Sequence, residues 1–248
     1  MKRWHQLLPN WAIIGLVAVV ITLNLLTSFY NWPLMTSGIV LSVIPFLLIV
    51  YFAKEKTMTN IFFVLFTLYY LGIIFGNLEQ LSMSAKLSEA CFLSVYGLAI
   101  GIMVSKLKYV KFEGLISVYL IVALLINTYL MYMMFGVVKD SFEDNVILVL
   151  TVSKGIAILV MGFLAFAIYL SKETSQSILF LAIICCFGFS DVLSFITTLY
   201  IEFWMFESFH HILQAIGLLL FCFYVYNSQN NFKNRLVTSR SAAKPLLA

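Results

Sequence analysis

The chain has 248 residues, of which 62% are hydrophobic and only 10% are charged. A soluble domain carries roughly 25% charged residues, so this composition cannot cover a water-facing surface and excludes a soluble globular enzyme. The mean hydropathy of +1.02 indicates a polytopic membrane protein. The net charge of +4 is explained by membrane topology, and we therefore expect no nucleic-acid partner.

Apolar segments long enough to cross a hydrocarbon core of about 30 Å as helices recur along the whole chain. They predict eight spans at residues 11–30, 33–53, 59–76, 87–105, 114–136, 146–170, 177–200 and 207–226. The first span is expected to be retained, because its apolar run is too long for a secretory signal and no small-residue cleavage site follows. We predict an all-α fold, a single transmembrane bundle of about eight helices over residues 1–226, with a basic, disordered tail over 227–248.

The basic residues predict the orientation, since cytoplasmic loops are enriched in Lys and Arg. Two of them, Lys86 and Lys139, fall in one set of loops. Twelve fall on the other side, namely Lys2, Arg3, Lys54, Lys56, Lys106, Lys108, Lys111, Lys172, Lys233, Arg235, Arg240 and Lys244. We therefore expect both termini to be cytoplasmic, in a cell inner membrane.

Polar side chains inside the spans are the candidates for function, because a charge at the centre of a bilayer costs about 2.5–3.5 kcal/mol on insertion scales. Asp191 lies nine residues before the outer end of its span, roughly 14 Å deep. Lys154 and Gln214 lie at similar depth in the neighbouring spans. Other polar residues mark the same outer half, namely Asn24, Asn77, Glu79, Glu89, Asn127, His210 and His211. We predict that Asp191, Lys154 and Gln214 border one cavity that opens to the outer side.

Structural roles are open for the same residues. An ion pair between Lys154 and Asp191 would also serve as a simple clamp between helices, and asparagines in spans commonly join helices by hydrogen bonds. No metal site or cofactor is expected, and the motifs of soluble hydrolases, phosphate-binding loops and zinc sites are absent from the sequence. Gly97 and Gly101 form a small-xxx-small pair, which predicts close helix packing in the fourth span.

Three segments in the last third of the chain resemble a known family. They are VSKGIAILVM at 152–161, FGFSDVL at 187–193 and HILQAIG at 211–217. In order and spacing they resemble the last three helices of the YhhN family of eight-helix membrane proteins, whose characterised members are lysoplasmalogenases. WPLM at 32–35 is similar to the Lys-Pro-Leu segment that opens the family's second helix, and Gly76 and Asn77 are similar to the Gly-Asp that ends its third. The resemblance spans most of the chain and is specific in the last 100 residues.

Several residues depart from the family pattern, so the chain resembles a divergent member. Asn77 stands where the family has an aspartate, with Glu79 two residues further on. Trp32 replaces a lysine, Tyr96 replaces a histidine in the fourth helix, and Lys154 replaces a tyrosine. Asp191 and Gln214 match the pattern.

The resemblance implies a hydrolase that cleaves the vinyl ether bond of a lysolipid, giving a fatty aldehyde and a glycerophospho compound. It implies Asp191 as the proton-transferring group, with Glu79 and Asn77 as its catalytic partners. Burial in lipid favours a neutral carboxyl group that acts as general acid, whereas a nearby Lys154 favours an ionised carboxylate that acts as base or stabilises a cation. The substrate-binding residues would be Lys154, Gln214, His211 and Ser190.

A different class of function is also open: a transporter of ions or small molecules, or a membrane-embedded sensor or binding protein. Carriers usually show internal repeats or broken helices in both halves. Pro45 in the second span has no clear counterpart in the second half of the chain, which disfavours a carrier. Membrane lipids are the expected partners in either case.

Overall fold

The computed structural model describes residues 11–30, 32–54, 58–78, 83–107, 115–139, 144–172, 174–199 and 203–243. Within these ranges the protein is all-helical, without strands, as the sequence predicts. The eight helices are α1 (Trp11–Phe29), α2 (Pro33–Lys54), α3 (Asn60–Gly76), α4 (Ser84–Leu107), α5 (Leu115–Val138), α6 (Asn145–Lys172), α7 (Ser175–Leu199) and α8 (Trp204–Ala243).

Four of these helices are long and apolar enough to cross a membrane, judged by length and composition. The qualifying segments are Ser84–Ser105, Asn145–Ser171, Ser175–Thr197 and Trp204–Ser228. Shorter apolar segments occupy α1, α2, α3 and α5, at Ala18–Phe29, Met35–Ile49, Asn60–Gly76 and Val118–Met133. Helices of this kind indicate a membrane protein. The count of eight spans and the cytoplasmic termini stay predictions.

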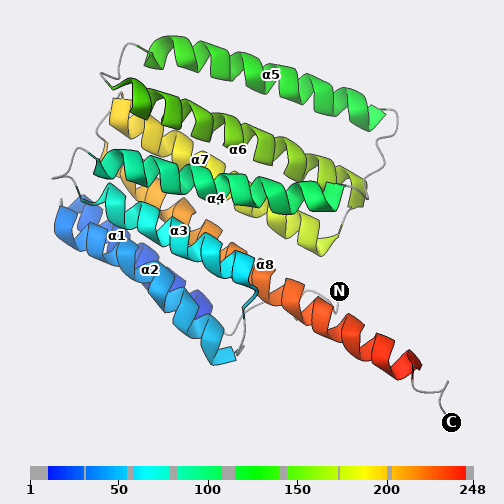
Figure 1. Ribbon diagram of the computed structural model, residues 1–248. Helices are drawn as coiled ribbons and strands as arrows, with labels where there is room; N and C mark the ends of the chain where they lie inside the picture. The colour runs from blue at the N-terminus through cyan, green and yellow to red at the C-terminus, as the bar shows by residue number, and fades with distance from the viewer. Residues whose placement is uncertain are drawn as a thin grey trace.

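The helices form a bundle with α4, α6, α7 and α8 at its centre (Figure 1). Helix α7 packs along α8, while α4 packs between α3 and α6. Helix α5 lies at one edge beside α6, and α1 and α2 lie at the opposite edge, against α8 and α3. Two polar regions described below lie on these two different sides of the bundle.

The interior is built from aromatic and branched side chains, and the outer surface also carries many large apolar side chains. Phe66 and Tyr224 are almost fully buried, and the rings of Phe66 and Phe221 lie 5.1 Å apart. On α5, Tyr119 and Tyr132 are 64% and 72% exposed. An exposed surface of this kind would drive aggregation in water but suits contact with lipid tails.

Close packing between α3 and α4 depends on glycines of α3. The hydroxyl group of Ser88 donates a hydrogen bond to the carbonyl oxygen of Gly72 at 2.8 Å. A Cβ atom added at Gly76 would lie 3.2 Å from the same hydroxyl oxygen. At Gly97 and Gly101 an added Cβ would meet nothing within 4 Å, because both glycines lie on an exposed face of α4. The predicted close packing at that pair is therefore wrong.

The C-terminal segment also differs from the prediction, which placed a disordered tail from residue 227. Helix α8 continues without a break to Ala243. The segment contains no glycine or proline before Pro245, and extending a helix that has already formed avoids the cost of nucleation. The predicted tail thus begins with about five further turns of helix, and residues 244–248 lie outside the described residues.

Candidate functional site

A cavity with a volume of about 520 Å³ lies between α3, α4, α5, α6 and α7. Its walls are mostly apolar or small, with Met131, Ile158, Gly155 and Gly188 among the lining residues. The ionisable residues that line it are Glu89, Lys154 and Asp191. Cavities of about 300–1,000 Å³ that combine apolar walls with few polar groups are typical of small-molecule sites.

Lys154 forms an ion pair with Glu89 across the contact between α6 and α4. Its Nζ atom lies 2.9 Å from Oε1 and 2.8 Å from Oε2 of Glu89. Both side chains are largely buried, with exposed fractions of 17% and 21%. The sequence suggested Asp191 as the partner of Lys154; the close contact in the structure is with Glu89, and Asp191 lines the same cavity. The lysine side chain also lies 5.8 Å from the ring centroid of Phe92.

Asp191 is held by a tyrosine from another helix. The hydroxyl group of Tyr96 on α4 donates a hydrogen bond to Oδ2 of Asp191 on α7, at 2.6 Å. Tyr96 is 3% exposed. The hydrogen bond fixes the carboxyl group at the wall of the cavity, in the same compartment as Lys154 and Glu89.

A second ion pair lies at the ends of the same helices. Lys86 Nζ lies 2.6 Å from Oδ2 of Asp144, and the neighbouring residues Ala85 and Ile147 line or border the cavity. The hydrogen bond from Lys86, together with one from the backbone N–H of Val146, holds the pKa of the Asp144 carboxyl below its usual value.

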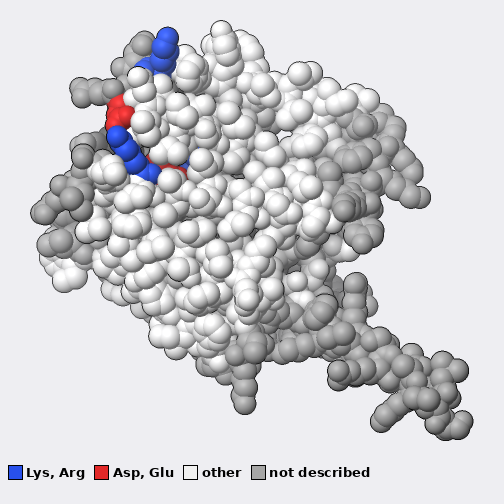
Figure 2. Space-filling model, viewed as in Figure 1, with Lys and Arg blue, Asp and Glu red and all other residues white. Residues whose placement is uncertain are grey.

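Figure 2 shows acidic and basic side chains gathered at one edge of this face, while the rest of the visible described surface is uncharged.

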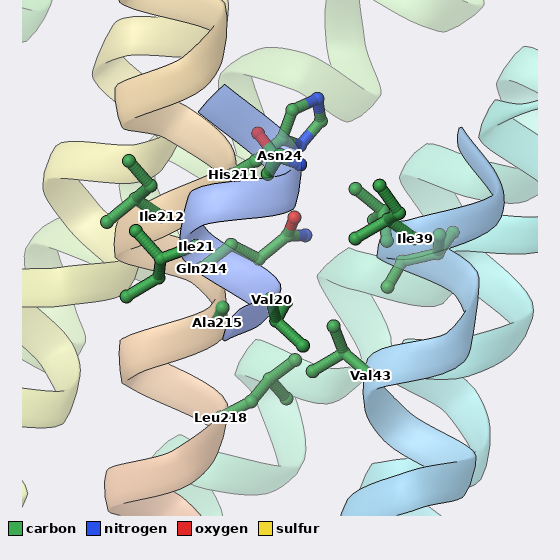
Figure 3. Close-up of a pocket in the computed structure, with 12 residues that line it drawn as sticks. Val20, Ile21, Asn24, Ile39, Val43, His211, Ile212, Gln214, Ala215 and Leu218 are labelled. Atoms are coloured by element: carbon green, nitrogen blue, oxygen red, sulfur yellow. The ribbon is translucent and has the colours of Figure 1, made fainter. Parts of the chain in front are cut away.

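Gln214 belongs to a separate polar region on the other side of α8. Its Nε2 atom donates a hydrogen bond to the Tyr69 hydroxyl at 2.8 Å. Gln214, His211 and Asn24 line a cavity of only about 10 Å³ between α1, α2, α3 and α8 (Figure 3). The predicted single cavity therefore brings together Asp191 and Lys154 but leaves out Gln214, because this face of α8 is turned toward α1 and α3.

The other predicted site residues lie outside the large cavity or outside the described residues. Ser190 is 2% exposed, and its Oγ lies 2.8 Å from Nδ1 of His210 and donates to the backbone oxygen of His210 at 3.1 Å, which joins α7 to α8. Asn77 is the C-cap residue of α3, and its Nδ2 donates to the carbonyl oxygen of Ile73 at 2.9 Å. Glu79 lies outside the described residues.

Three residues contribute to the polar contacts without having been predicted to do so. Glu89 is marked in the sequence only as a polar residue at the outer end of a span, although a carboxylate among apolar residues is a signal for a buried partner. The sequence analysis does not single out Tyr69, and it names Tyr96 only as the residue that replaces a histidine of the family pattern. Their hydroxyl groups bond Gln214 and Asp191, a role that a tyrosine in an apolar helix does not reveal by itself.

Comparison with known proteins gives no match: no protein-family model, no curated protein and no solved structure is significantly similar to the chain. The resemblance to the YhhN family therefore stays a prediction that depends on the three motifs. The geometry of Glu89, Lys154, Asp191 and Tyr96 is independent of that resemblance, and it is the basis for a function.

Proposed function

We propose that the protein is a membrane-embedded hydrolase that cleaves the vinyl ether bond of a single-chain lysolipid, in a cell inner membrane with both termini cytoplasmic. The observation that carries the proposal is the 520 Å³ cavity, which combines apolar walls with Glu89, Lys154 and Asp191. A single-chain amphiphile needs this division, since its chain requires apolar contacts and its head group requires charged ones.

The chemistry requires one proton transfer and one water molecule. A proton adds to the vinyl carbon that is not bonded to oxygen, which leaves an oxocarbenium ion. Water adds to the cationic carbon and loses a proton, and the resulting hemiacetal collapses to a fatty aldehyde and the alcohol of the glycerophospho compound. A positioned carboxyl group can exchange the proton and stabilise the cation, as the paired carboxyl groups of glycosidases do.

Asp191 is the group assigned to this step. It lines the cavity, and the Tyr96 hydroxyl occupies one of its oxygens, which limits the rotation of the carboxyl group. Lys154 lies in the same cavity and offers a cation to the lipid phosphate, in exchange for part of its contact with Glu89. The proposal leaves Gln214, His211 and Ser190 to helix packing.

A non-catalytic binding or transport function is the second candidate. It is favoured by the ion pair between Lys154 and Glu89, since a charged ligand could take the place of one partner of the pair. It is also favoured by Asn77, since an amide cannot supply the second carboxyl group that the family pattern has there.

The test uses the purified full-length chain in lipid nanodiscs. It is incubated with a vinyl ether lysolipid, and with alkyl ether and acyl lysolipids of the same chain length and head group. We expect aldehyde release from the vinyl ether alone, because only the vinyl group can be protonated on carbon. Binding of all three lipids without aldehyde would favour the second candidate, and no binding of any of them would contradict the proposed hydrolysis of a lysolipid.

A further inference from the structure

Among the buried polar atoms of α1 and α8 that have no hydrogen-bond partner in the described part of the chain, two belong to residues that line one cavity. One is Oδ1 of Asn24, a residue that is only 3% exposed. The other is Nδ1 of His211. A buried polar group without a partner costs about 1–3 kcal/mol, so two such atoms at one place call for a shared partner.

Both residues line the same small cavity, together with Gln214 (Figure 3). The remaining walls are aliphatic, with Val20 and Ile21 from α1 and Val43 from α2 among them. The volume of about 10 Å³ is close to the roughly 10–15 Å³ that one water molecule needs. A cation such as Ca²⁺ would require about six to eight oxygen ligands, and the lining residues do not offer them.

We propose that this cavity binds one water molecule, which donates a hydrogen bond to Oδ1 of Asn24 and bonds Nδ1 of His211, and so joins α1 to α8. Buried waters typically make about two to four hydrogen bonds. The direction of the bond to His211 depends on the tautomer of the ring. Gln214 at the same cavity bonds Tyr69, so the water extends the polar contacts between α3 and α8 to α1.

Two other polar side chains of α1 bond within their own helix. The hydroxyl group of Thr22 donates to the carbonyl oxygen of Ala18, and that of Thr27 donates to Leu23, both within α1 itself. Asn24 instead projects toward a cavity shared with α8 (Figure 3). The water site is independent of the proposed hydrolysis, because it lies outside the 520 Å³ cavity.

A structure of the full chain in nanodiscs at about 2 Å resolution tests the proposal directly. We expect density for one water molecule within hydrogen-bond distance of Asn24 Oδ1 and His211 Nδ1, and its loss in Asn24→Leu. A direct contact between the two side chains, or a dry cavity with both atoms unpaired, would overturn the proposal.

Thermal unfolding supplies a second measurement. Asn24→Leu and His211→Phe should each lower the unfolding midpoint by about 2–4 °C, the effect of one ordinary hydrogen bond in a chain of this size. The double variant should lose little more than either single one, since both remove the same bridge. Asn127→Leu is the matched control and should leave the midpoint unchanged, because Asn127 is exposed on α5 and its amide nitrogen donates to Ala123 of the same helix. Fully additive losses would contradict a shared water.

Discussion

The two polar regions of the bundle differ in charge and in the space around them. On the side of α4, α6 and α7, the ionisable residues Glu89, Lys154 and Asp191 line a cavity of about 520 Å³. On the side of α1 and α8, the amides of Asn24 and Gln214 line a cavity of about 10 Å³. In a medium of low dielectric constant, a charged group is tolerated where an opposite charge or a ligand pairs with it. A neutral polar group needs only one hydrogen bond to a side chain of another helix. The first region is suited to binding and the second to packing.

The largest effect is expected from Asp191→Asn. The amide keeps an oxygen that accepts the hydrogen bond from Tyr96 but cannot exchange a proton, so folding should persist while vinyl ether hydrolysis falls by roughly 10²–10⁴-fold. Asp144→Asn, the same substitution outside the cavity, is the control in the aldehyde assay. A residual rate above about one tenth of the parent rate would assign Asp191 to the packing of α4 against α7.

Lys154→Met tests how much the ion pair between Lys154 and Glu89 contributes to stability. The substitution leaves the Glu89 carboxylate buried without its cation, which in buried pairs costs about 3–5 kcal/mol of unfolding free energy; the lower end applies, since about a fifth of each side chain is exposed. The double variant Glu89→Gln/Lys154→Met should recover most of that loss. Equal losses in denaturant unfolding of the single and double variants would show that the pair contributes through packing of its alkyl chains.

Substitutions beside the small cavity should have smaller effects, and they should change the stability of the protein but not its activity. Tyr69→Phe leaves Nε2 of Gln214 without its acceptor and should cost about 1–3 kcal/mol, whereas Tyr69→Phe/Gln214→Leu removes both partners and should cost less. The KM for the lysolipid should stay that of the parent in both variants. A raised KM would mean that the two regions act together.

The smallest effect is expected at the partly exposed ion pair of Lys86 and Asp144. Asp144→Asn should shift the unfolding midpoint at pH 7 by no more than about 2 °C, because exposed pairs contribute little. The folded-state pKa of Asp144 is lowered, so its contribution is present above the usual value of about 3.9 and is lost as the pH falls through the folded value. The difference between parent and variant should therefore vanish in acid. A difference that persists at low pH would have another cause.

The helices could be predicted from the sequence because each apolar run is bounded by polar residues. The predicted span 59–76 corresponds to α3 at Asn60–Gly76, and 33–53 corresponds to α2 at Pro33–Lys54. The predicted start at residue 87 is three residues late for α4, which begins at Ser84, because a helix can extend beyond its apolar segment.

The sequence could not predict which polar side chains contact each other. It gives the depth of each side chain along its helix but not the direction in which the side chain points. Lys154 has two carboxylates in the same cavity, Glu89 and Asp191, and the rotation of each helix about its axis decides which of them it contacts. Gln214 lies at a depth similar to theirs but faces α1 and α3. A helix turns by about 100° per residue, so a small error in its rotation moves a side chain from one cavity to another.

The length of α8 has a practical consequence. The helix runs unbroken from Trp204, past His211 and Gln214, to Ala243, and it protrudes from the bundle toward the C-terminus (Figure 1). Residues 229–243 follow the apolar segment that ends at Ser228, and at 1.5 Å per residue they extend roughly 22 Å beyond it. A soluble carrier protein fused in helical register at Ala243 would be joined to the bundle by one continuous helix. The fusion would give this 28.2 kDa membrane protein a larger marker for particle alignment in electron microscopy, on the same helix that lines the small cavity.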